Sequence, residues 1–341
     1  MLTKYVFSEE VEGNSNMVLS PLSIQIVLGL IAAGSSGPTK DQLLHFLKSK
    51  SIDELNSLYL HILNIVFVDG SPNGGPRLFV ANGIWIEQTL PFNLDFKQVV
   101  DNVYKATSES GFHEQGEWDK KFEAFNTKHH KFHFLDGEST RAPFMTSRKK
   151  QCISVFKGFK VLKLFYKMGT NNNIPSIFSQ SGDTRKLCMY FILPDAHDGL
   201  PALLDKITSE PGFLNRHIPS RQVEVGKFLI PNFKTTLGFE APEVLKGLGL
   251  TLPFFPGGLD KMVDSAEAKA LFVSNMFHKS FIEVNEGGTE AAAATAAVIK
   301  VSRKFEAPPD FVADHPFLFL IRDESTGVVL FTGSVLNPRA D

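Results

Sequence analysis

Residues 286–301 read Glu-Gly-Gly-Thr-Glu-Ala-Ala-Ala-Ala-Thr-Ala-Ala-Val-Ile-Lys-Val, and this stretch decides how the chain is interpreted. Alanine has the highest helix propensity of all residues, whereas the branched residues Val298, Ile299 and Val301 favour strands. A segment of divided preference beside a glycine pair is able to hold more than one conformation. Local composition favours an exposed alanine-rich helix capped by Thr289, and a latent strand is the alternative.

The strand alternative gives the segment two unlike faces, because successive side chains of a strand point in opposite directions. One face carries Glu290 and Lys300 and therefore the charges. The other face is small and uncharged, and consists of Thr289, Ala291, Ala293, Thr295, Ala297 and Ile299. Such a strand could enter between two existing strands without overpacking the core beneath them.

The whole chain has 341 residues, a formal net charge of -2 and 43% hydrophobic residues, which suffices for a sizeable core. Its length fits one large domain or two ordinary ones. A charge this close to zero provides no electrostatic footprint for a nucleic acid or an anionic membrane. We therefore expect neither of these as a partner.

The two cysteines and the first residues of the chain indicate the cellular compartment of the protein. The spacing of Cys152 and Cys188 matches no metal or redox motif, so we predict two buried free thiols. Residues 1–10 lack the basic start and apolar core of a secretory signal, and no apolar run reaches membrane-spanning length. These features predict a cytoplasmic protein, with an extracellular location as the alternative.

Helix signals come first along the chain and strand signals later, which predicts a single α+β domain over 1–341. Ser20 and Pro21 form an N-cap and first-turn pair, and Gly34 ends the apolar helix that follows. Further helices are predicted over 39–48, 51–66, 93–103, 200–207 and 241–248. Strands are predicted over 152–166, 186–193, 221–233, 271–284 and in a central hairpin over 317–336.

Several quoted stretches together resemble the serpin family, and its plant branch in particular. The resemblance lies in Asn16-Met-Val-Leu-Ser-Pro-Leu-Ser23, Phe277-His-Lys-Ser-Phe-Ile-Glu-Val-Asn285, the run from Glu286 to Ala294, and Phe311-Val-Ala-Asp-His-Pro-Phe-Leu-Phe-Leu-Ile321. Residues 193–201 and 221–226 resemble plant members. The similarity implies the serpin fold, with N-terminal helices, a large central β-sheet, smaller sheets and an exposed reactive-centre loop.

The resemblance also implies that the chain is a protease inhibitor and not an enzyme. In the family the target protease cuts the exposed loop, an acyl-enzyme forms, and the freed loop inserts as a new strand into the large sheet. The loop would span about 286–310 here. Its hinge would consist of Glu286, Gly287, Gly288, Thr289, Glu290, Ala291, Ala292, Ala293 and Ala294.

The bond that the loop offers to a protease follows from the same resemblance. Counting from Glu286 by the plant pattern gives the bond Ser302–Arg303, while a protease that prefers basic residues would cut after Arg303 or after Lys304. An exposed basic pair implies a trypsin-like serine protease or a metacaspase-like cysteine protease as the partner of a monomeric inhibitor. A solvated basic turn is the alternative interpretation of these residues.

The resemblance breaks between Phe112 and Trp118, where family members carry a helix that crosses the large sheet and then most of a central strand. Only His113-Glu-Gln-Gly-Glu117 joins the two sides here. The missing strand would be one wall of the slot that receives the loop, and its loss should leave strand edges unpaired. A non-inhibitory relative that proteases cut as a plain substrate is therefore the alternative function.

Other chemistry has little support in the sequence. His129, His130 and His133 are flanked by Lys128 and Lys131, which would repel a cation, so we predict no metal site and no cofactor. His278 and His315 lie in the segments that resemble the serpin family, so we predict that both have structural roles. The sequence contains no nucleophile elbow, no P-loop and no dinucleotide fingerprint.

Overall fold

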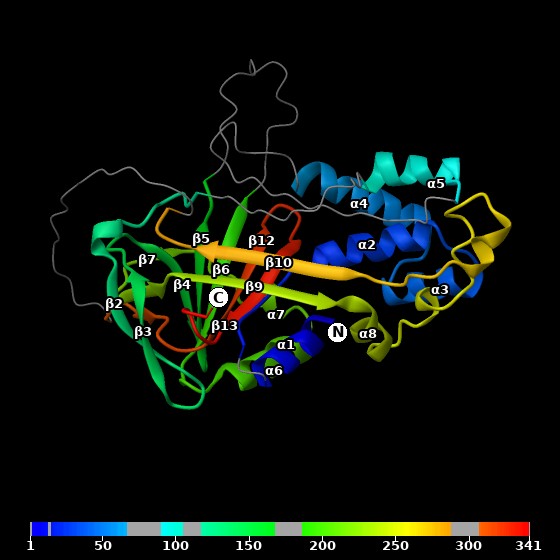
Figure 1. The fold of residues 1–341 in the computed structure, drawn as a ribbon. Coiled ribbons are helices and arrows are strands. Elements are labelled where there is room, and N and C mark those ends of the chain that lie inside the picture. The colour runs from blue at the N-terminus through cyan, green and yellow to red at the C-terminus, as the bar shows by residue number, and fades with distance from the viewer. Residues whose placement is uncertain are drawn as a thin grey trace, which may run out of the picture.

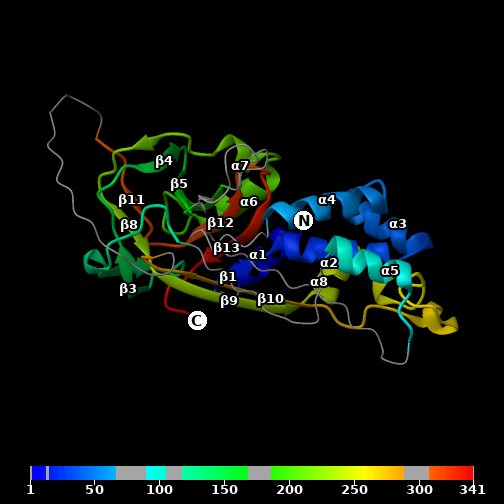
Figure 2. The ribbon, with the colours of Figure 1, turned by 90° about the horizontal axis from the view of Figure 1, so that it is seen from above.

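The computed structural model describes residues 2–12, 15–66, 90–104, 117–167, 186–287 and 307–340. The helices in these ranges are α1 (Leu2–Glu12), α2 (Pro21–Ala33), α3 (Gly37–Phe46), α4 (Ile52–Val66), α5 (Leu94–Val99), α6 (Leu200–Ser209), α7 (Phe213–Arg216) and α8 (Ala241–Gly247). None of them has the length and apolar character that a membrane crossing requires. Helices α2 to α5 gather at one end of the molecule (Figures 1 and 2).

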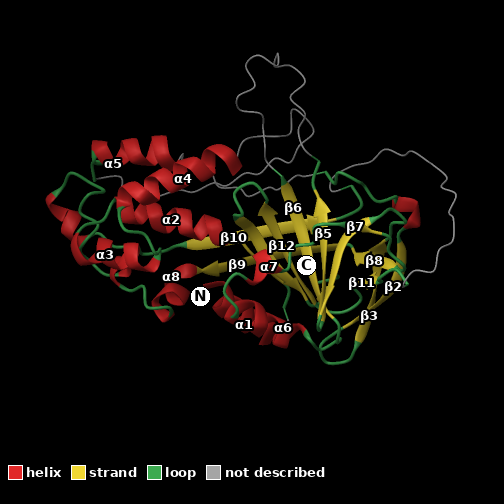
Figure 3. Cartoon of the chain, turned by 180° about the vertical axis from the view of Figure 1, so that it is seen from behind, coloured by secondary structure: helices red, strands yellow, loops and turns green. Residues whose placement is uncertain are grey.

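Seven strands form the largest sheet, in the order β1-β13-β12-β6-β5-β4-β7. Its members are β1 (Met17–Leu19), β4 (Gln151–Phe156), β5 (Phe159–Phe165), β6 (Leu187–Pro194), β7 (Gln222–Val223), β12 (Phe317–Asp323) and β13 (Val329–Val335). Figure 3 shows this sheet from behind, with β5, β6 and β12 side by side. The predicted central hairpin is confirmed, because β12 pairs with β13 on one edge and with β6 on the other.

A two-stranded antiparallel sheet of β9 (Phe233–Glu240) and β10 (Phe277–Val284) runs across the larger sheet (Figure 1). Along β10 the even-numbered residues are buried and the odd-numbered residues face outward or lie half-buried, so only one face packs on the core. Among the described residues, no strand pairs with the edge of β10 opposite β9. β10 thus keeps one edge without a strand partner in this part of the chain.

A third sheet has four strands in the order β11-β8-β3-β2. These are β2 (Lys128–His133), β3 (Ser139–Met145), β8 (Phe228–Pro231) and β11 (Phe311–Val312). β11 pairs in parallel with β8, whereas the β2–β3 and β3–β8 pairs are antiparallel. The short strand β11 fixes the point at which the chain returns after residue 306.

Helix α2 begins as predicted, with the Ser20 hydroxyl accepting a hydrogen bond from the Ser23 amide at 3.3 Å and Pro21 in the first turn. Nine of its residues are buried, so the helix lies within the core. Its N-terminus touches β10, because the Ser20 amide donates to Nε2 of His278 at 3.3 Å. This contact joins the start of the chain to the strand that leads to residue 286.

Two of the predicted strands were wrong in extent. Residues 152–166 form two strands, β4 and β5, which turn at Gly158 with a φ of 90°. Residues 221–233 are divided between two sheets. β7 lies at the edge of the seven-stranded sheet, β8 lies in the four-stranded sheet, and Gly226 lies between them. A Cβ at Gly226 would collide with the Asp310 carboxylate, so the chain bends there to let residues 308–310 approach.

One predicted helix changes its type along its length, and one predicted strand is shorter than predicted. The helix predicted over 93–103 is α-helical only to Val99 and continues as a π-helical turn to Tyr104. The strand predicted over 271–284 begins at Phe277. The prediction of two buried free thiols is confirmed for Cys152 and Cys188, and burial raises the pKa of the Cys188 thiol to about 12.

Candidate functional site

The hinge predicted from sequence begins where β10 ends, at Glu286. The carboxylate Oε1 of Glu286 accepts hydrogen bonds from the Thr127 hydroxyl at 2.5 Å and from the Asn232 amide at 3.0 Å. Thr127 immediately precedes β2, and Asn232 lies between β8 and β9. One carboxylate therefore joins the end of β10 to the four-stranded sheet.

The charge of Glu286 is stabilised in this position. Burial on its own would raise the pKa of Glu286, but the hydrogen bonds from Thr127 and Asn232 outweigh it and hold the pKa below its ordinary value. The side chain is thus a carboxylate near pH 7. Hydrogen bonds to a charged acceptor are stronger than those between neutral groups, so this anchor resists being pulled away.

Residues 117–122 cover the end of β10 from the side opposite β9. The amides of Trp118 and Phe122 donate to the carbonyls of Gly287 and Glu286 at 3.2 and 2.9 Å. The indole Nε1 of Trp118 donates to the Asn285 carbonyl at 2.9 Å. Three hydrogen bonds therefore fix the last residues before the loop.

Trp118 also joins this end of β10 to the seven-stranded sheet. Its indole is 3% exposed and stacks on Tyr166, with ring centroids 4.8 Å apart. The same two residues form an isolated antiparallel bridge. Trp118 is therefore a buried residue of the core and the sheet.

His278 is the second residue of β10, and its buried side chain matches the structural role predicted for it. Its Nε2 accepts from the Ser20 amide and lies 2.7 Å from the Ser280 hydroxyl. A ring nitrogen that accepts an amide proton carries no proton itself, so the imidazole is neutral. Burial lowers the pKa of His278 to about 4, in agreement with this geometry.

The residues that follow the predicted loop, 309–311, are also held by hydrogen bonds. The Gly226 amide donates to the Pro309 carbonyl at 3.1 Å, and the Lys227 amide donates to the Asp310 carboxylate at 2.6 Å. The Phe311 amide then donates to the Lys227 carbonyl at 2.8 Å and begins β11. The segment between Gly287 and residue 307 therefore connects two fixed points, one on β10 and one on the four-stranded sheet.

Glu286 and Gly287 are the two predicted hinge residues that the structure describes. The other predicted hinge residues, Gly288 to Ala294, and the candidate scissile residues Ser302, Arg303 and Lys304 lie outside the described residues. So does the junction from Phe112 to residue 116, at which the chain was predicted to be shortened. The sequence did not reveal the anchoring roles of Trp118, Thr127 and Asn232, because these partners lie far from Glu286 along the chain.

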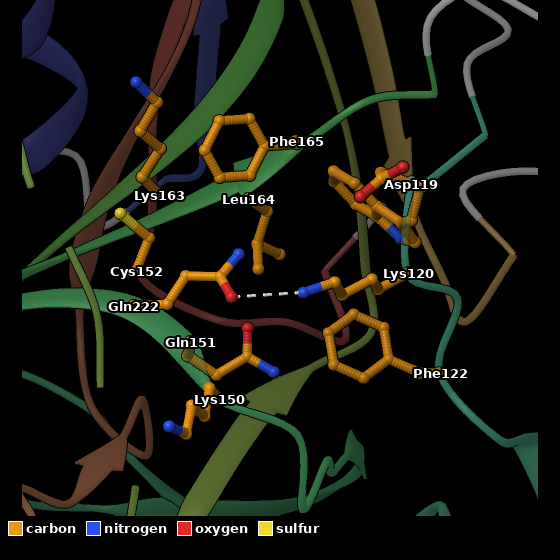
Figure 4. A pocket seen from close by; sticks show the side chains of 11 residues that line it. Asp119, Lys120, Phe122, Lys150, Gln151, Cys152, Lys163, Leu164, Phe165 and Gln222 are labelled. Atoms are coloured by element: carbon orange, nitrogen blue, oxygen red, sulfur yellow. Dashed lines mark hydrogen bonds between the residues drawn. The ribbon is translucent and has the colours of Figure 1, made fainter. Parts of the chain in front are cut away.

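A small pocket lies beside this anchor, between the residues around Trp118 and the edge strands of the seven-stranded sheet (Figure 4). Lys120 reaches across it and donates to Gln222 Oε1 at 3.3 Å. The pocket has room for about one or two water molecules, which is too little for a substrate. The chemistry of this site therefore centres on the segment between two anchors and not on a cleft.

A strand with an edge that lacks a strand partner, continuing into a segment tied down at both ends, is the arrangement of a protein that presents a loop. The family model described as Serpin (serine protease inhibitor) matches residues 2–114 and 111–338. The chain belongs to the serpin family.

Plant relatives extend this result over nearly the whole chain. It is 47% identical to Serpin-ZX of Arabidopsis thaliana, covering 99% of this chain and 95% of the relative, and 43% identical to Serpin-ZXA of Oryza sativa subsp. japonica, covering 95% and 90%. The solved structure of Arabidopsis AtSerpin1 in its native stressed conformation matches with a TM-score of 0.86 and 45% identity, covering 99% of this chain and 95% of that one. The serpin fold predicted from the sequence is confirmed.

The matches also bear on the length of the chain. The alignment to Serpin-ZX spans 386 residues, whereas this chain has 341, so the relative carries residues that this chain lacks. The two segments of the family match meet at 111–114. This is where the sequence departs from the family pattern, next to Phe112.

Proposed function

We propose that this serpin inhibits serine or cysteine endopeptidases as a suicide substrate. The observation that carries the proposal is the state of β10, which pairs only with β9 among the described residues and leads directly into the hinge at Glu286. A cut in the loop would free the residues after Gly287 to fold back alongside this edge. The small, uncharged face from Thr289 to Ala297 would then face the core.

The energy for this insertion comes from the edge of β10. Four of its eight residues direct their amides and carbonyls away from β9, which corresponds to about eight hydrogen bonds in an antiparallel pair. At roughly 1 kcal/mol net for each bond, insertion would release on the order of 8 kcal/mol. That energy would hold an acyl-linked protease in a distorted position and prevent the ester from being hydrolysed.

In this proposal the target protease recognises the basic pair Arg303 and Lys304. Cleavage after Arg303 or after Lys304 suits a trypsin-like serine protease or a metacaspase-like cysteine protease, whereas the plant pattern of the family places the cut at Ser302–Arg303. Buried, unpaired Cys152 and Cys188 suit a reducing compartment, so we also propose that the protein acts in the cytoplasm. We expect it to act as a monomer.

The second candidate is a serpin that proteases cut without being trapped. The observation that favours it is the shortness of the chain beside Phe112, since the alignment to Serpin-ZX is longer than this chain. If the residues lost include a wall of the slot, the freed loop would pair on one edge only. The inserted loop would then form hydrogen bonds with β10 alone, and deacylation could outpace insertion.

Incubation with trypsin followed by a denaturing gel separates the two candidates. An inhibitor gives an adduct whose mass is the sum of protease and serpin and which survives denaturant, because the link is covalent. A plain substrate gives two fragments and free trypsin. The mass of the released C-terminal peptide identifies the cleaved bond, since it begins at Arg303, Lys304 or Phe305.

Hinge variants test whether insertion is the cause. Thr289→Arg places a charge on the face that would enter the core, so we expect the adduct to disappear while cleavage continues. Glu290→Arg introduces the same side chain one residue later on the outward face and should retain the adduct. Equal adduct yields from both variants would contradict insertion of this segment.

A further inference from the structure

Three histidines from distant parts of the chain stack on one another at a corner of the molecule. His133 ends β2, His197 lies in the turn between β6 and α6, and His315 lies between β11 and β12. The ring centroids of His133 and His197 are 4.7 Å apart, as are those of His197 and His315. Asp314 adds a carboxylate to the group, and its backbone carbonyl accepts from the His133 amide at 2.8 Å.

The orientation of the His315 ring is fixed by a backbone carbonyl. Its Nε2 lies 2.8 Å from the carbonyl oxygen of Pro194, and a carbonyl only accepts hydrogen bonds, so Nε2 carries a proton. His315 is 5% exposed, so the hydrogen bond is shielded from water. A histidine that binds a metal through one nitrogen characteristically donates its other N–H to such an acceptor.

The second nitrogen of His315 faces a negative charge. Nδ1 lies 3.0 Å from Oδ1 of Asp314. Two lone pairs that face each other at this distance repel unless a cation lies between them, either a proton or a metal ion.

His197 supplies a third donor to the same point. Each of His197, Asp314 and His315 offers one ligand atom, and these three atoms lie within 4.8 Å of one another. Among the described residues, none forms a hydrogen bond with the His197 ring, and the side chain is exposed on a turn. The ring is therefore able to move toward a shared ion.

We propose that His197, Asp314 and His315 bind a zinc ion, with water completing the coordination. Two imidazoles and a carboxylate are a donor set that Zn²⁺ favours over Mg²⁺ or Ca²⁺, which prefer oxygen ligands. Bonds of about 2.1 Å in a tetrahedral site place ligand atoms roughly 3.4 Å apart. The His315–Asp314 pair already meets this spacing, and His197 needs to move inward by about 1–1.5 Å.

The ion would link the connection between β6 and α6 to the connection between β11 and β12. Residues 307–312 lie just before Asp314, so the site would strengthen the anchor at the return end of the reactive loop. The His133 ring lies against the His197 ring at an interplanar angle of 31°, so it is in place to orient that ring. Sequence reasoning considered only His129, His130 and His133 and missed this group, because its members come from three separate segments.

Calorimetric titration of the EDTA-treated protein with zinc chloride tests the proposal, with cobalt chloride as a spectroscopic probe. We expect one Zn²⁺ for each chain and a visible Co²⁺ absorption typical of tetrahedral coordination, while millimolar Mg²⁺ gives no response. His197→Ala should weaken zinc binding by at least about 10-fold. His197 is exposed, so this variant should fold normally.

The matched control is His129→Ala, which removes an exposed histidine from the same strand as His133 but from outside the group. Its zinc affinity should equal that of the unmodified chain. Zinc binding that is unchanged in His197→Ala would overturn the proposal, as would the absence of zinc uptake by the unmodified protein. In the latter case a proton, and not a metal, holds Asp314 and His315 together.

Discussion

β12 and β10 both form antiparallel pairs with their neighbours, yet their surroundings differ. β12 has a strand partner on each edge, and six of its seven residues are buried. β10 pairs with β9 alone among the described residues and buries one face. The contrast teaches that this fold concentrates its stability in the seven-stranded sheet and leaves a strand edge available in the small one.

The two strands also differ in what a new neighbour would gain. The backbone groups of β12 are already bonded on both sides, so another strand cannot join it. The outer edge of β10 has no strand partner among the described residues, and in our proposal the freed loop would pair there. Stability and capacity for change are thus located on different sheets of one molecule.

Truncating a core side chain should give the largest difference between the two strands in the free energy of unfolding. Phe319→Ala in β12 removes a fully buried ring that contacts Phe233, at a centroid distance of 5.4 Å, and should lower the free energy of unfolding by about 4 kcal/mol. Phe281→Ala on the outward face of β10 should cost less than about 1 kcal/mol. Urea unfolding followed by circular dichroism measures both, and equal losses would remove the distinction between the strands.

A second effect sharpens the comparison through pH, because β10 contains the buried histidine His278. Its pKa is about 4 in the folded protein and about 6.5 when unfolded, so between these values the unfolded chain binds more protons. The stabilisation is complete above pH 6.5 and is lost as the pH falls toward 4. The loss should amount to about 3 kcal/mol, measured as unfolding free energies between pH 4 and pH 7.

The control for this prediction is His278→Gln, which retains an acceptor for the Ser20 amide but has no proton to gain. Its unfolding free energy should vary less between pH 4 and pH 6.5 than that of the unmodified chain. Parallel pH profiles for the two proteins would show that another group is responsible.

The smallest effect concerns the anchor at the end of β10. Glu286→Ala leaves the donors of Thr127 and Asn232 without their acceptor, which should lower the free energy of unfolding by about 1–2 kcal/mol. Glu286→Gln keeps an oxygen in place and should cost less. Because the folded pKa of Glu286 is depressed, the penalty for losing its charge should shrink as the pH falls below about 4.5. A constant penalty across that range would contradict the role of the charge.

Local features of the fold were predictable because their causes lie within a few residues. Ser20 caps α2, since its hydroxyl and the Ser23 amide are three residues apart. The turn of the β12–β13 hairpin is fixed by Gly327, with a φ of 75°, and by the Asp323 carboxylate, which accepts from the Thr326 amide at 3.0 Å. The family itself was identified from segments that carry this local information.

Other features depended on contacts between distant segments. The strand predicted over 221–233 was divided between two sheets because residues 308–310 approach Gly226, and nothing near Gly226 in the sequence shows that approach. Of the candidate site, the sequence predicted Glu286 and Gly287 as hinge residues. It could not supply the partners Trp118, Thr127 and Asn232.

The sequence by itself determined the class of fold and predicted the position of the loop and the small residues of its hinge. These follow from propensity, side-chain volume and alternation, which act between neighbours. Only the tertiary structure decided that β10 pairs with β9 in a sheet of their own, that the Glu286 carboxylate is held by two other segments, and that His197 meets Asp314 and His315. Such contacts join residues that are up to 159 positions apart, and their geometry is set only when the whole chain has packed.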